Sequence, residues 1–202
     1  MQNLSPDDQL CLQNELTNGE SILWSGKPNP HVIFHPSDWY MIPFSLMWGG
    51  FAIFWEGGVT GILDVSRGHA APSFFMFWGI PFVLAGQYFI WGRFFYAAWR
   101  KVRMVYAITN RRVLVISRPP KGKTISSFIE NIPSIDKEVR ADGIGTLKFG
   151  QINSPWGGGR NNTTSMDGLY LNSGVPVFVD IDDAASAYKV IATLRERILH
   201  QS

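Results

Sequence analysis

The chain has very little cysteine: Cys11 is the only one among its 202 residues. A single cysteine excludes an intrachain disulfide and a thiolate metal cluster, and it agrees with a reducing, cytosolic setting for the N-terminal segment. Residues 1–18 also lack a basic start followed by an apolar run, so no cleavable signal peptide is predicted there.

Formal charge is missing from two long stretches, residues 39–55 and 70–92. A bilayer core ~30 Å thick needs roughly 20 apolar residues of helix, and aromatic residues favour the two membrane interfaces. The pattern therefore predicts a transmembrane helical hairpin over residues 37–102, with an external loop at 56–70. The predicted interface anchors are Trp39, Tyr40, Trp55, Trp91 and Trp99.

The positive charges are unevenly placed. Nine of the eighteen Lys and Arg residues fall between Arg93 and Lys123, whereas the loop 56–70 holds one, Arg67. By the positive-inside rule, the loop is expected outside and both termini in the cytoplasm. This predicts a multi-pass protein of the bacterial inner (plasma) membrane.

Small residues recur within the two uncharged stretches. Ser45 and Gly49 form a small-xxx-small step, and Gly79 and Gly86 permit close approach on the second stretch. Such residues predict that the two helices pack on each other, with Gln87 forming a hydrogen bond across the contact. Because neither stretch contains an ionisable group, an ion or proton pathway is not expected.

The hydrophobic period changes after Arg103 to the alternation of β-strands. A hairpin over 104–116 with its turn at Asn110, several further short strands and one final helix are expected. The further strands are predicted at 124–129, 135–140, 146–149, 169–172 and 175–178. The final helix begins at Asp182 or Asp183, and its apolar stripe is Tyr188, Ile191, Leu194 and Ile198.

The N-terminal segment contains a helix start at Ser5 and a short strand near residues 20–26. The predicted organisation is therefore a cytoplasmic segment at 1–36, the helical hairpin at 37–102 and a cytoplasmic domain at 103–202. The fold class is α+β, with the strands forming a small, partly open barrel closed by the C-terminal helix.

Four sequence motifs resemble those of a known family. They are YAITNRRVLV at 106–115, GESILWSG at 19–26, DGIGTLKFG at 142–150 and FVDIDDA at 178–184. Together they resemble bacterial membrane proteins that carry a pleckstrin-homology-like (PH-like) domain. The resemblance implies a PH-like antiparallel β-barrel or sandwich, no established catalytic residues and a general role in interaction at the membrane. The glycine-rich loop 154–166 departs from the family pattern.

Three motifs have a chemical interpretation, but a structural one is favoured for each. His31 and His35 have a metal-ligand spacing, yet prolines bracket them and no acid is near. Asp180, Asp182 and Asp183 are better explained by helix capping than by acid–base chemistry or Mg²⁺ binding. The loop 157–160 lacks the ending of a phosphate-binding loop. No catalytic residue, metal or cofactor is predicted.

Six basic residues form a candidate binding cluster: Arg93, Arg100, Lys101, Arg103, Arg111 and Arg112. Near an anionic leaflet each contributes ~1 kcal/mol of attraction, so the cluster is a candidate for binding lipid headgroups or a partner. The equally weighted alternative is that these residues only set topology and form a solvated turn. Nucleic-acid binding is not favoured, because the nearby aromatic residues are better explained by the bilayer.

The leading functional hypothesis is a non-enzymatic membrane protein that presents a PH-like interaction domain, as an adaptor or accessory subunit or as a self-assembling scaffold. Its expected partners are membrane lipids and a protein partner or its own copies. A sensor of anionic lipid headgroups is the alternative. An enzyme is a remote third possibility, since the sequence shows no nucleophile–base pair.

Overall fold

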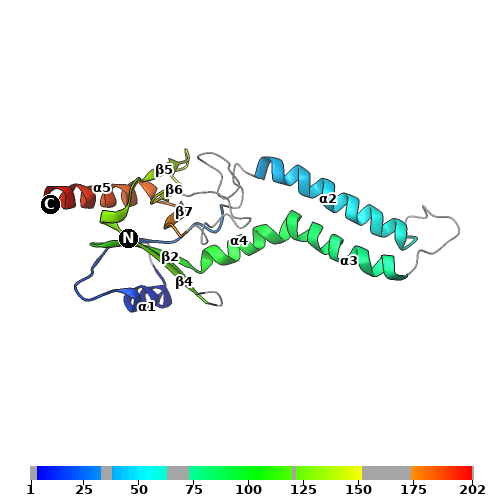
Figure 1. Cartoon of the computed structure of the whole chain (residues 1–202), viewed down its shortest axis with the longest axis horizontal. Coiled ribbons are helices and arrows are strands. Elements are labelled where there is room, and N and C mark those ends of the chain that lie inside the picture. The colour runs from blue at the N-terminus through cyan, green and yellow to red at the C-terminus, as the bar shows by residue number, and fades with distance from the viewer. Residues whose placement is uncertain (1–3, 33–37, 63–72, 120–121, 152–173, 202) are drawn as a thin grey trace. The chain divides into compact units, whose positions relative to one another are not determined.

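The computed structural model describes residues 4–32, 38–62, 73–119, 122–151 and 174–201. The protein is α+β and divides into two compact units (Figure 1). The sheet unit comprises Met1–Val32 and Ala97–Ser202, and the hairpin unit comprises Ile33–Tyr96. The N-terminal segment therefore belongs to the same compact unit as the C-terminal half.

The first sheet of the sheet unit has four antiparallel strands in the order β1-β2-β3-β4. Their bounds are β1 Ile22–Gly26, β2 Met104–Thr109, β3 Arg112–Ser117 and β4 Lys123–Phe128. The predicted hairpin with its turn at Asn110 is confirmed as β2 and β3. Strand β1 pairs with β2, placing Trp24 opposite Ile108. In the sequence, the whole hairpin unit therefore lies between two strands that are hydrogen-bonded neighbours in the sheet.

The second sheet has three antiparallel strands in the order β5-β6-β7. Its bounds are β5 Asp136–Val139, β6 Gly145–Lys148 and β7 Val177–Ile181, and the short helix η2 Ile129–Asn131 lies between β4 and β5. The described strands thus form two separate ladders, not the single partly open barrel that the sequence predicts. Helix α5, Ala184–Gln201, follows β7.

The alternation of β2 and β3 gives the first sheet two apolar faces. Tyr106 and Val115 face the main core, shared with the second sheet and α5, whereas Val105 and Leu114 face helix α1, Pro6–Glu15. Figure 1 shows α1 and α5 on opposite sides of these strands. Both faces are covered, so every residue of β2 is buried.

Both predicted helix starts in this unit are confirmed. The Asp8 amide donates to Ser5 Oγ at 3.3 Å at the start of α1, and the Ser186 amide donates to Asp183 Oδ1 at 3.1 Å at the start of α5. These bonds satisfy amides that have no partner within the helix. The predicted stripe of α5 also packs on the core: Ile191 and Leu194 are buried, and Tyr188 and Ile198 are partly buried.

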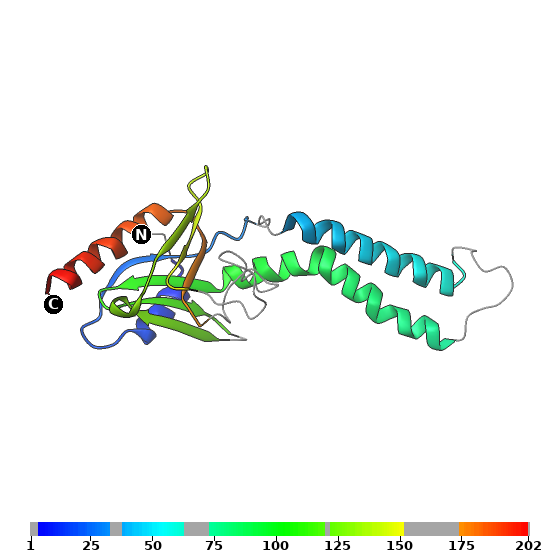
Figure 2. The same ribbon diagram turned by 45° about the horizontal axis from the view of Figure 1, so that its top comes forward.

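The hairpin unit is built from two helices that run side by side (Figure 2). Helix α2 is Asp38–Val59 and helix α3 is Ser73–Gln87; the π-helix η1, Tyr88–Gly92, leads into α4, Arg93–Val102. The backbones come close where a Cβ on Gly86 would lie 2.9 Å from the Gly49 Cα. The predicted packing of the two helices through small residues is therefore confirmed at this pair.

Within the described ranges, no helix has both the length and the apolar character required to cross a membrane. Helix α3 has 15 residues, fewer than the roughly 20 that a span requires. Helix α2 has 22, but Pro43, Glu56 and several glycines interrupt its apolar residues. The predictions of a transmembrane hairpin and of multi-pass inner-membrane localisation are therefore wrong. The anchor role assigned to the five aromatic residues depended on those spans.

Some sequence predictions lie outside the described residues. These are most of the loop between the two helices, the second histidine of the spaced pair, the glycine-rich loop and one strand: residues 63–70, His35, 154–166 and 169–172.

Candidate functional site

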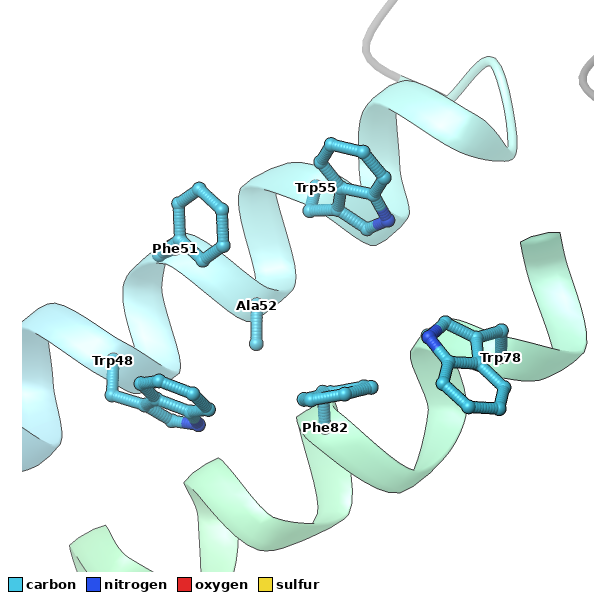
Figure 3. A pocket seen from close by; sticks show the side chains of 7 residues that line it. Trp48, Phe51, Ala52, Trp55, Trp78 and Phe82 are labelled. Carbon is cyan, nitrogen blue, oxygen red and sulfur yellow. The ribbon is translucent and has the colours of Figure 1, made fainter.

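The hairpin unit carries an aromatic groove between α2 and α3 (Figure 3). The groove has a volume of about 240 Å³, and the residues that line it are Trp48, Phe51, Ala52, Trp55, Trp78, Gly79 and Phe82. The short side chain of Ala52 leaves room between the rings. This volume lies just below the usual range for drug-sized ligands, so the groove suits a small molecule or a single side chain.

The walls of the groove are continuous series of rings. Phe82 of α3 connects the rings of the two helices: its centroid lies 6.4 Å from that of Trp48 on α2 and 6.1 Å from that of Trp78 on α3. On the α2 side, the Phe51 and Trp55 centroids are 6.4 Å apart. Figure 3 shows Trp55 and Trp78 on opposite helices, with their indole nitrogens turned toward the space between them. The groove therefore presents aromatic faces and N–H donors together.

A carboxylate packs against the floor of the groove. A methyl group on Gly79 would coincide with Oε2 of Glu56, so the carboxylate occupies the space that any other residue would fill. This Oε2 atom is buried, and within the described part of the chain it accepts no hydrogen bond. A buried polar atom without a partner requires an explanation, such as an ion or ligand.

The predicted helix-packing residues have different surroundings. Gly49 and Gly86 form the close contact, whereas the buried Ser45 hydroxyl donates to the Ile42 carbonyl of its own helix at 2.9 Å. Gln87 is exposed, and Gly79 meets Glu56 as described above. The contact therefore depends on the glycines.

The predicted basic cluster divides between distinct environments. Lys101 is 2 % exposed, and its Nζ donates to Asp180 Oδ2 at 2.7 Å and to the Val32 carbonyl at 2.6 Å. Arg140 approaches the other carboxylate oxygen, Oδ1, at 3.7 Å. Lys101 is thus a buried structural cation that ties α4 and the segment after β1 to strand β7.

Arg112 is engaged by a second buried carboxylate. Its Nε donates to Glu20 Oε1 at 2.9 Å, and Glu20 also accepts from Thr17 and Thr109. Burial alone would raise the pKa of Glu20, but the hydrogen bonds from Arg112, Thr17 and Thr109 outweigh it and lower the pKa to about 2. The same pair raises the pKa of Arg112. This network joins the turn before β1 to the β2–β3 turn.

The other members of the predicted cluster have different local surroundings. The Arg93 guanidinium lies 4.4 Å above the Phe94 ring in the hairpin unit. In the sheet unit, the Arg103 guanidinium lies 3.9 Å above the Trp99 ring, Arg111 is exposed at its turn and Arg100 is partly buried. Headgroup binding by all six residues remains a prediction. Two of the six positive charges, those of Lys101 and Arg112, already form ion pairs with carboxylates of the protein.

The other candidates for chemistry have structural roles. Asp183 caps α5, Asp182 accepts from Asn29 at 2.8 Å, and Asp180 is held by Lys101. In the described ranges, no group of three His, Cys, Asp or Glu side chains is placed to hold a metal ion.

Sequence reasoning missed the groove because the aromatic residues of both uncharged stretches were interpreted as parts of membrane spans, with Trp55 as an interface anchor. A signal was present: Trp48, Phe51, Ala52 and Trp55 recur at three- and four-residue steps, and so do Trp78 and Phe82. This spacing places each set on one helix face. Comparisons with family models, with curated proteins and with solved structures found no match.

Proposed function

We propose that this protein is a non-enzymatic interaction protein in which a PH-like sheet unit carries a hairpin unit that associates with a second copy of the chain. The PH-like assignment is supported by the two antiparallel sheets followed by a single closing helix, the order of elements that the sequence resemblance implies. The non-enzymatic assignment is supported by the structural partners of Lys101, Asp180 and Asp183.

The observation that carries self-association is the exposed apolar surface of the hairpin unit. Outside the groove, exposed side chains follow both helices: Phe44, Met47 and Phe54 on α2, and Phe77 and Leu84 on α3. Phe77 is 72 % exposed and Met47 66 %. Large exposed apolar patches are uncommon on isolated proteins and mark interaction surfaces.

A second copy is the favoured occupant because this surface carries no charge. Between Trp39 and Trp55, and between Ser73 and Gly92, the sequence has no Asp, Glu, Lys or Arg. Two identical uncharged faces meet without like-charge repulsion, and a two-fold dimer places the same patch of each copy in the contact. A partner chosen by charge would need complementary charges, which these faces do not offer.

Sedimentation equilibrium of the full-length chain tests this proposal. The wild-type protein is expected to be dimeric or larger at micromolar concentration, and the variant Phe44→Ser/Met47→Ser/Phe77→Ser is expected to be monomeric. The matched control is Leu10→Ser/Phe128→Ser, which removes exposed apolar side chains from the sheet unit and should leave the assembly unchanged. A monomeric wild type, including one that binds only a different protein, would overturn self-association.

A further inference from the structure

We propose that the aromatic groove of the hairpin unit is a binding site for a small alkylated ammonium ion. Its volume of about 240 Å³ and its five aromatic rings define the shape of the site, and the Glu56 carboxylate, whose buried Oε2 packs on Gly79, defines its charge. This site is separate from the self-association surface, which uses residues outside the groove.

The rings favour a cation over a neutral apolar group. The face of an aromatic ring carries negative electrostatic potential, so a cation within about 6 Å of a ring centroid is attracted to it, and tryptophan is the strongest such partner. Three of the five rings are tryptophans, Trp48, Trp55 and Trp78, and they come from both helices. Adjacent centroids along the wall lie 6.1 to 6.4 Å apart, a spacing that allows one cation to contact two rings.

The carboxylate supplies the complementary charge. Glu56 directly follows Trp55 in the chain and packs on Gly79, and both of these residues line the groove. In the described part of the chain its Oε2 has no donor, although burying an unpaired polar atom is costly. A cation seated among the rings compensates this charge without a hydrogen-bond donor of its own.

An alkylated ammonium fits better than a metal ion or a primary amine. A metal ion requires several oxygen, nitrogen or sulfur ligands, whereas the side chains here offer only the Glu56 carboxylate and the indole N–H groups, which are donors and not ligands. A primary ammonium has three N–H donors to satisfy. Alkyl groups remove those donors and fill an apolar space.

Isothermal titration calorimetry of the full-length protein tests the proposal with choline and with its uncharged carbon isostere, 3,3-dimethylbutan-1-ol. The two molecules have nearly the same shape, so only the charge differs. Choline is expected to bind at least tenfold more tightly than the isostere. Equal binding of the two, or no binding of choline at millimolar concentration, would overturn the proposal.

Variants locate the binding. Glu56→Gln removes the charge and is expected to weaken choline binding about tenfold while leaving the isostere unaffected; Trp78→Leu is expected to abolish binding. The matched controls are Glu130→Gln in the sheet unit and Trp91→Leu, which removes an exposed tryptophan of the hairpin unit outside the groove. Circular dichroism confirms that each variant is folded. Unchanged choline binding by Glu56→Gln or by Trp78→Leu would contradict the site.

Discussion

Lys101 Nζ lies 2.7 Å from Asp180 Oδ2, and both side chains are almost completely buried. Lys101 belongs to α4, at the point where the chain returns from the hairpin unit, and Asp180 belongs to β7. The same ammonium also binds the carbonyl of Val32, the last residue before the hairpin unit. Within the sheet unit, the Lys101 ammonium thus ties the two segments that flank the hairpin unit in the sequence to strand β7.

Replacing Lys101 by methionine should destabilise the sheet unit by about 3 to 5 kcal/mol, because the buried Asp180 carboxylate then loses the ammonium group that lies 2.7 Å from it. The double variant Lys101→Met/Asp180→Asn should recover part of this loss. Asparagine is chosen because Asp180 has a φ of 49°, a left-handed conformation that asparagine tolerates well. Urea unfolding of the three proteins checks the prediction, and equal midpoints for the wild type and Lys101→Met would refute it.

Acid should destabilise the protein through Glu20. The pKa of Glu20 is lowered from 4.5 to about 2 by folding, so its stabilising contribution is complete above the unfolded pKa and is lost as pH falls from about 5 toward 2. The contribution is about 3 kcal/mol. Because Glu20→Gln removes the titration, its stability should fall at pH 7 and vary less with pH.

Urea midpoints measured between pH 2 and pH 7 give the comparison for Glu20. The exposed Glu196 serves as the control site, and Glu196→Gln should follow the wild-type profile. Asp8, whose pKa is also lowered by its bonds to Lys27 and Ser5 despite burial, should leave some acid dependence in both variants. Identical profiles for wild type and Glu20→Gln would count against the network.

Replacement by alanine should change the stability of the hairpin unit in opposite directions at two of its glycines. At Gly86 the new Cβ would lie 2.9 Å from the Gly49 backbone, whereas at Gly50 it meets nothing within 4 Å. Gly50→Ala should stabilise α2 by about 0.5 to 1 kcal/mol through reduced backbone entropy, and Gly86→Ala should destabilise the unit by forcing the helices apart. Hydrogen exchange of the α2 and α3 amides measures both effects; a shift of the same sign in both variants would disprove the close contact.

Removing the hairpin unit should leave a folded sheet unit. A chain that joins Val32 to Ala97 through a flexible linker of about six Gly and Ser residues retains β1, and so keeps Trp24 stacked on Phe178 at 5.5 Å. A fragment of residues 103–202 loses that ring, β1 and α1, and should unfold at a lower temperature or without a cooperative transition. Thermal unfolding followed by circular dichroism compares the two, and equal transitions would show that the N-terminal segment is dispensable.

Local patterns predicted the local structure. The alternation on either side of Asn110 is sufficient to indicate β2 and β3, and the spacing from Tyr188 to Ile198 indicates the buried face of α5, because each pattern depends only on neighbours in the chain. The small residues Gly49 and Gly86 likewise indicated the helix contact. These features need no knowledge of distant residues.

Features that depend on distant residues were not predicted. Lys101 and Arg112 were grouped by their charge, yet each pairs with a carboxylate far away in the sequence, Asp180 and Glu20. Periodicity does not identify such partners. The absence of charge was interpreted as a membrane span, although helix length and apolar character are separate requirements that lack of charge alone does not meet.

The pairing of β1 with β2 also sets an order of events during synthesis. The ribosome completes β1 and then makes all of Ile33–Tyr96 before β2 emerges. Until then β1 has no neighbour, and Trp24 has no core to enter. The two helices of the hairpin can associate during this interval, so the nascent chain is expected to form its helical insertion before its four-stranded sheet.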